Sequence, residues 1–64
     1  MYIYIVRDQR GQLWLYEYEP FRSKQVFGNW TCNYGQYMRI HDSTGEFDCI
    51  TWNSKPKKIK LSYD

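Results

Sequence analysis

The chain has 64 residues and a formal net charge of +2, and 20% of its residues are aromatic. A chain of this length forms one domain, residues 1–64, whose marginal core often needs a disulfide, a metal or self-association. The aromatic content excludes a disordered chain, the lack of a run of about 18 apolar residues predicts no membrane span, and the mild charge neither requires nor excludes a nucleic-acid partner.

The N-terminal part of the chain predicts a β-hairpin. Tyr2–Val6 and Leu13–Tyr18 are two runs of strand-forming residues around Asp8-Gln9-Arg10-Gly11. This sequence is typical of a type I turn closed by a glycine in the left-handed region, and it sets Asp8 opposite Gln12. Counting outward from that pair predicts these facing residues: Val6 with Trp14, Ile5 with Leu15, Tyr4 with Tyr16, and Tyr2 with Tyr18.

Both faces of this hairpin are apolar, because side chains alternate between the two sides of a strand. One face is aliphatic and consists of Ile3, Ile5, Leu13 and Leu15. The other face is aromatic and consists of Tyr2, Tyr4, Trp14, Tyr16 and Tyr18. A small antiparallel sheet normally has one solvated face. The second face therefore needs a loop of the chain, a partner or a ligand to cover it.

A second hairpin is predicted after a less readable segment, 21–35, which begins beyond Pro20. The turn Asp42-Ser43-Thr44-Gly45 repeats the first turn signature and joins Tyr37–His41 to Phe47–Trp52. The same counting rule pairs Met38 with Ile50, Arg39 with Cys49 and His41 with Phe47. It also places Asp48 on the core side, which conflicts with the hydrophobic pattern.

The end of the chain predicts a last strand from Lys57 to Tyr63, with Ile59, Leu61 and Tyr63 facing inward. About five strands joined by short turns, without a helix, favour an all-β fold. We expect a small five-stranded antiparallel meander or a partly open barrel of the SH3-like or OB-like kind.

The aromatic face allows three interpretations. Segment 21–35, which carries Phe21, Phe27 and Trp30, could fold over it as a second small core. It could instead contact a protein partner or a second copy, since Tyr and Trp are enriched at interfaces. It could also stack bases of a single-stranded nucleic acid.

The lysines near the C-terminus have two interpretations. A stripe of Lys55, Lys57, Lys58 and Lys60 could contact phosphates of a nucleic acid. Lysines on a terminal strand also protect a sheet edge from pairing with other chains. The nucleic-acid interpretation requires these lysines and the tyrosines to share one surface.

No catalytic, metal or cofactor site is expected from the sequence. Cys32, Cys49 and His41 are not spaced as a nucleophile with its base or as zinc ligands. No signal peptide is expected, so we predict a cytoplasmic protein with both cysteines free.

Several short runs resemble a family of small proteins. These runs are Leu13-Trp14-Leu15-Tyr16, Glu19-Pro20, Gly28-Asn29-Trp30, Phe47 to Trp52, and Lys55-Pro56-Lys57-Lys58-Ile59-Lys60-Leu61. Together they resemble short all-β proteins of gut bacteria and their phages, a family without an established activity. The resemblance implies an accessory protein of a phage or other mobile element, and it assigns no site residues.

The sequence thus leads to two functional hypotheses. The first is a non-catalytic binding or regulatory protein that acts through protein–protein contacts, with itself as a homo-oligomer or with another protein. The second is a small single-stranded nucleic-acid-binding barrel that uses the aromatic face and the C-terminal lysines. Neither hypothesis involves a cofactor or a membrane.

Overall fold

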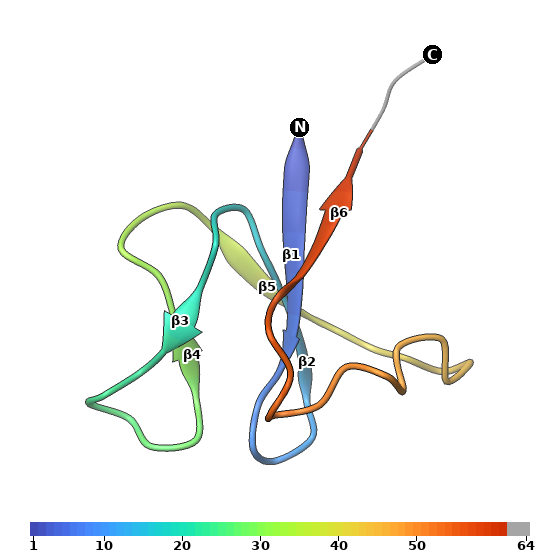
Figure 1. The fold of residues 1–64 in the computed structure, drawn as a ribbon, viewed down its shortest axis with the longest axis horizontal. Coiled ribbons are helices and arrows are strands. Elements are labelled where there is room, and N and C mark those ends of the chain that lie inside the picture. Colours follow the sequence, from blue (N-terminus) through green and yellow to red (C-terminus); the bar gives the residue numbers. More distant parts are fainter. Residues whose placement is uncertain (62–64) are drawn as a thin grey trace.

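The computed structural model describes residues 1–61 and contains two antiparallel sheets. The larger sheet has the strand order β5-β2-β1-β6, and β3 and β4 form a separate two-stranded hairpin (Figure 1). The strands are β1 (Tyr2–Arg7), β2 (Leu13–Tyr16), β3 (Phe21–Arg22), β4 (Trp30–Thr31), β5 (Tyr37–Ile40) and β6 (Lys57–Lys60).

The first hairpin forms in the predicted register. Asp8 N donates to Gln12 O at 2.9 Å, and Gly11 has a φ of 93°, which only glycine adopts without strain. The facing pairs Val6–Trp14, Ile5–Leu15 and Tyr4–Tyr16 are confirmed.

The predicted outermost pair, Tyr2 with Tyr18, is wrong. Strand β2 ends at Tyr16, and Tyr2 faces Lys60 of β6 instead. The ring of Tyr18 packs against Tyr34, with the two ring centroids 4.5 Å apart. The chain bends out of the sheet at Glu17 and Tyr18.

The second predicted hairpin is also wrong. Strand β5 pairs with β2 and not with residues 47–52, so that Met38 faces Leu15 and Arg39 faces Trp14. Residues 46–49 form a turn rather than a strand. Asp48 is exposed there, which removes the conflict that the predicted register created.

The connection between β5 and β6 is held by side-chain hydrogen bonds in place of a ladder. The carboxylate of Asp42 accepts the backbone N–H groups of Phe47 at 2.8 Å and Glu46 at 2.9 Å. These hydrogen bonds lower the pKa of Asp42, and the bond from Phe47 has the largest effect. The guanidinium of Arg7 donates to Ile50 O at 2.7 Å and to Phe47 O at 3.1 Å. The connection is therefore anchored to β1.

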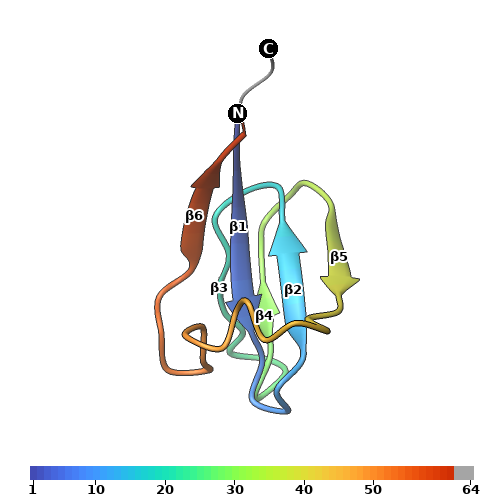
Figure 2. The same cartoon turned by 90° about the vertical axis from the view of Figure 1, so that its right-hand side faces the viewer.

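Two segments cover the two faces of the larger sheet. The β3–β4 hairpin lies against the aromatic face, and the connection 41–56 lies across one end of the aliphatic face (Figures 1 and 2). The aliphatic core contains Ile5, Leu13 and Ile50, with Ile40, Phe47 and Ile59 packed around it. The aromatic core contains Val6, Tyr16 and Trp30, with Tyr4, Trp14, Cys32 and Trp52 packed around it.

The fold is all-β as predicted, and no helix occurs in residues 1–61. The number and arrangement of strands differ from the prediction: the described residues form six strands rather than five, and the order of the larger sheet is not that of a meander. The sheet does not close into a barrel, because β5 and β6 remain at its two edges. Tyr63, the predicted inward residue of the last strand, lies outside the described residues.

The docking of the connection 41–56 can be tested at Ile50. Ile50 is 3% exposed, so Ile50→Ala should lower the free energy of unfolding by about 2–5 kcal/mol. The matched change Cys49→Ala, at an exposed neighbour, should cost less than about 0.5 kcal/mol. Urea unfolding measures both variants. Equal small losses would mean that the connection does not pack on the sheet.

Candidate functional site

The covering of the aromatic face centres on Tyr16 and Trp30. The hydroxyl of Tyr16 donates to Trp30 O at 2.9 Å, and Trp30 Nε1 donates to Arg7 O at 3.0 Å. Both side chains are buried, so each polar atom needs the partner it has. Arg22 of β3 lies over the rings of Trp30 and Trp52, at 4.8 and 5.0 Å from their centroids. The β3–β4 hairpin is thereby joined both to the sheet and to the end of the connection.

Segment 21–35 thus covers the aromatic face, as the first of the three interpretations proposed, but Trp30 is the only one of the three expected aromatic residues that does so. Phe21 is 47% exposed and Phe27, near the tip of the hairpin, is 88% exposed. Two of the three aromatic residues expected to form the second core therefore take no part in it.

The five aromatic residues predicted as a binding face are not equally accessible. Tyr16 is buried, Tyr4 and Trp14 are half-buried, and Tyr2 and Tyr18 are each 44% exposed. Trp14 is fixed in place because its Nε1 donates to the buried carboxylate of Asp8 at 3.0 Å. The structure therefore brings Tyr4, Trp14 and Tyr16 together as core residues and leaves Tyr2 and Tyr18 at the surface.

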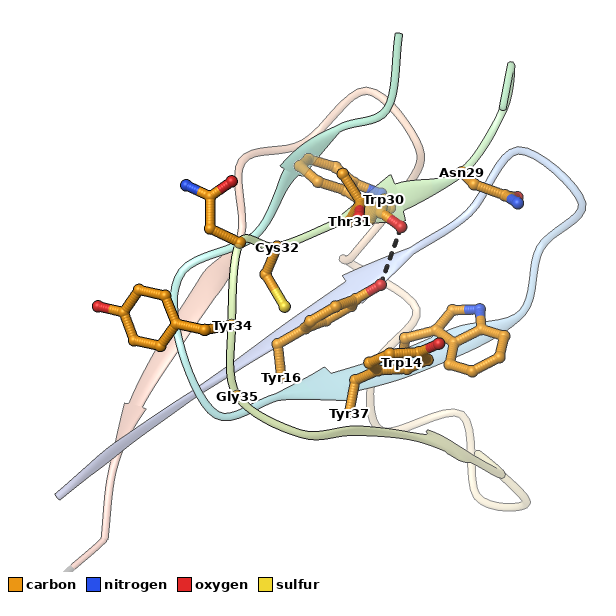
Figure 3. A pocket seen from close by; sticks show the side chains of 10 residues that line it. Trp14, Tyr16, Asn29, Trp30, Thr31, Cys32, Tyr34, Gly35 and Tyr37 are labelled. Carbon is orange, nitrogen blue, oxygen red and sulfur yellow. Dashed lines mark hydrogen bonds between the residues drawn. The ribbon is translucent and has the colours of Figure 1, made fainter. Parts of the chain in front are cut away.

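A pocket of about 290 Å³ remains between the aromatic face and β4 (Figure 3). The Cys32 thiol points toward the ring of Tyr16 in this pocket (Figure 3). Tyr37 forms its outer wall; its ring is stacked on Tyr16, with centroids 5.3 Å apart, and 60% of the residue is exposed. Sequence reasoning missed Tyr37 because it assigned β5 to the wrong neighbour. The sequence did contain a signal for Tyr37, namely an aromatic residue two positions before Arg39 in the predicted strand Tyr37–His41.

Burial of Tyr16 changes its acid–base chemistry. The pKa of Tyr16 is raised from 10.0 to about 12. Desolvation by burial is the largest cause, and the neighbouring Cys32 raises the pKa further. The phenol therefore stays protonated above pH 10, where an exposed tyrosine ionises, and it remains the hydrogen-bond donor to Trp30 O.

A second hollow, of about 280 Å³, lies on the aliphatic face beyond the reach of the connection. Its floor consists of Ile3 from β1 and Leu15 from β2, and Met1 and Met38 flank them. Met38 is 58% exposed and Met1 is 70% exposed. Figure 2 shows this end of the sheet with no segment of the described chain in front of it. We refer to Met1, Ile3, Leu15 and Met38 as the open apolar face.

A polar rim borders the open apolar face. Glu17 N donates to Gln36 O at 3.0 Å, and Gln36 N donates to a carboxylate oxygen of Glu17 at 3.1 Å. Both residues are exposed and line the hollow. An apolar centre with a satisfied polar border is the usual anatomy of a protein interface.

The predicted lysine stripe is divided by the sheet. Lys58 faces Tyr4 and Lys60 faces Tyr2 on β1, so these two lysines share the aromatic side of the sheet. Lys57 faces Ile5, on the opposite side, and Lys55 follows the turn 51–54, directly before Pro56. The amino group of Lys58 is 4.1 Å from the centroid of the Tyr2 ring.

Both cysteines are free thiols, on different sides of the sheet. Cys32 is half-buried beside the aromatic core, and Cys49 is exposed in the turn on the aliphatic side. Within residues 1–61, no three His, Cys, Asp or Glu side chains come together as ligands of a metal ion. The described part of the chain also has no helix of the length and apolarity that a membrane span requires.

Comparison of the chain with protein-family models, with curated proteins and with solved structures finds no match. The candidate site is therefore defined by its geometry: the open apolar face is an apolar hollow on the sheet that the described segments leave uncovered.

The raised pKa of Tyr16 predicts a loss of stability in alkali. Above pH 10 the unfolded chain releases the phenolic proton, whereas the folded chain holds it up to a pH of about 12. Stability from this group is thus complete below pH 10 and falls by roughly 2–3 kcal/mol as the pH rises to 12.

Tyr16→Phe tests this expectation. At pH 7 the variant should lose about 1 kcal/mol, the value of the hydrogen bond to Trp30 O. Its stability should then fall less steeply than that of the unmodified protein between pH 10 and 12. Tyr34→Phe, at a residue that is 66% exposed, is the control and should leave the pH profile unchanged. Parallel profiles for all three proteins in urea titrations would contradict the assignment.

Proposed function

We propose that this protein is a non-catalytic binding or regulatory protein that acts through protein–protein contacts at the open apolar face. The observation that supports the proposal is the exposure of Met38 beside Leu15 and Ile3, at the end of the sheet that the connection 41–56 leaves bare. The binding surface is therefore on the opposite side of the sheet from the aromatic residues that the sequence suggested.

Apolar area remains uncovered on the aliphatic face of the sheet. Each Å² of apolar surface removed from water contributes about 25 cal/mol, so a small domain gains much from covering a sheet face. The chain uses its two long connections for this purpose, and on the aliphatic face the second connection packs at the end of the sheet that carries Ile5 and Leu13. Contiguous exposed apolar residues inside a polar rim mark interaction sites.

The context of the proposed function comes from the sequence. The resemblance to short proteins of gut bacteria and their phages supports an accessory role in a mobile element. In this proposal the protein works in the cytoplasm, where Cys32 and Cys49 stay reduced.

Photo-crosslinking at position 38 tests the proposed contact surface. A p-benzoylphenylalanine residue at Met38 should give protein adducts on irradiation in the cells that make the protein, because the side chain would lie within an interface. The mass of the adduct distinguishes a second copy from another protein. The same residue at Phe27 is the control, since this position is 88% exposed but outside the open apolar face. Equal yields at both positions, or none at 38, would refute the proposal.

A second candidate function is binding of single-stranded nucleic acid, and one observation favours it. Lys58 and Lys60 are in register with Tyr4 and Tyr2, so cationic and aromatic side chains do share a surface. Of the aromatic residues, Tyr2 is accessible there, and its ring already lies against Lys58. Such a surface combines phosphate contacts with a stacking platform.

Salt-dependent binding tests this second function. Lys58→Gln with Lys60→Gln should weaken binding to an oligothymidylate, and each lost phosphate contact should reduce the slope of log K against log salt by about 0.7. Lys57→Gln is the matched control, because Lys57 faces the aliphatic side. Fluorescence anisotropy of a labelled oligonucleotide measures all three proteins. No binding by the unmodified protein at low salt would exclude the function.

A further inference from the structure

We propose that β5 pairs with β5 of a second copy, antiparallel, with Met38 facing the second copy's Met38. This inference rests on the proposed function, since it names a second copy of the chain as one partner of the open apolar face. It is drawn from the edge of the sheet and from the charges along that edge.

The backbone of β5 is in the right phase for such pairing. Glu17 N donates to Gln36 O, so this facing pair is a hydrogen-bonded one. Hydrogen-bonded and non-bonded pairs alternate along an antiparallel ladder. Met38 therefore directs its backbone groups toward β2, whereas Tyr37 and Arg39 direct theirs away from the sheet. Among the described segments, none lies beyond β5 on that side (Figure 2).

The two edges of the sheet differ in charge, which selects β5 over β6. By the same alternation, Lys58 and Lys60 direct their backbone groups outward from β6, because Leu61 N donates to Met1 O. Pairing of β6 with a second β6 would place lysine against lysine, and lysines on an edge strand oppose such pairing. Strand β5 carries a single charge, that of Arg39, beside Tyr37 and Met38.

The side chains of β5 also select the register. With Met38 facing the second copy's Met38, each Tyr37 faces an Arg39 of the other chain. This places a cation beside an aromatic ring twice across the interface, and it lets Tyr37 and Arg39 exchange backbone hydrogen bonds. A shift that centres the axis on Arg39 would place the two arginines face to face, which is unfavourable.

The pairing is continuous with the open apolar face. Met38 faces Leu15 within one copy, on the aliphatic side of the sheet. In the proposed dimer the two Met38 side chains meet at the symmetry axis, and the open apolar faces of both copies become one strip. The contact therefore uses the exposed methionine and the free backbone edge together.

Disulfide trapping tests both the pairing and the register. In a background with Cys32→Ser and Cys49→Ser, Met38→Cys should form a disulfide-linked dimer in mild oxidant. Facing residues in a non-bonded antiparallel pair have Cα atoms about 4.5 Å apart, within the range that a disulfide spans. The matched change Ile40→Cys should give no disulfide-linked dimer, because the Cα atoms of residue 40 in the two copies would lie about 14 Å apart.

A second pair of variants tests the edge without a new bond. Arg39→Pro removes an outward N–H group of β5, and proline is tolerated at such edge positions. Sedimentation should then show loss of the dimer. Lys58→Pro makes the same change at the β6 edge and should leave the dimer intact.

Each other outcome overturns the inference. A disulfide dimer from Arg39→Cys but not from Met38→Cys would refute the register. A dimer that survives Arg39→Pro would refute the use of the β5 edge. If neither cysteine crosslinks while p-benzoylphenylalanine at Met38 captures a different protein, the dimer fails and the proposed function stands. If neither method gives an adduct, both fail.

Discussion

The carboxylate of Asp8 holds the turn on which the whole sheet depends. One of its oxygens accepts Gln12 N and the other accepts Trp14 Nε1, while Gly11 supplies the positive φ that closes the turn. These contacts fix the register of β1 against β2, and the register sorts the side chains into an aliphatic and an aromatic face. A shift by one residue would exchange the two faces, so the covering segments and both edge strands take their positions from this turn.

The same turn explains how much of the fold the sequence could predict. The first hairpin is local, because Asp8 and Gly11 specify the turn and the flanking residues agree with the register. The second turn has the same signature, but its strands do not pair. Strand β5 pairs instead with the free edge of β2, and Asp42 holds the turn through bonds to backbone N–H groups. A turn motif specifies its own bend, whereas strand partners depend on which edges are free elsewhere in the molecule.

The candidate site was predictable in kind but not in position. Two apolar faces in so short a chain do leave one incompletely covered. Which face stays open depends on contacts between distant residues: Trp30 with the hydroxyl of Tyr16, Arg22 with Trp52, and Arg7 with the carbonyl of Ile50. None of these pairs has a local sequence signal. The exposure of Met38, and with it the open apolar face, follows from them.

The lysine-rich strand β6 has a consequence for the size of any assembly built on this sheet. A sheet with two free edges can add chains without limit, which is how fibres grow. Here the two edges differ in charge. The residues of β6 whose backbone groups point outward are Lys58 and Lys60, whereas β5 carries a single charge, that of Arg39. Two copies joined through β5 would present only lysine-bearing edges to solvent. Growth of the sheet would then stop at the dimer. The β5 edge would pair with a second copy, and the chain would not form fibres.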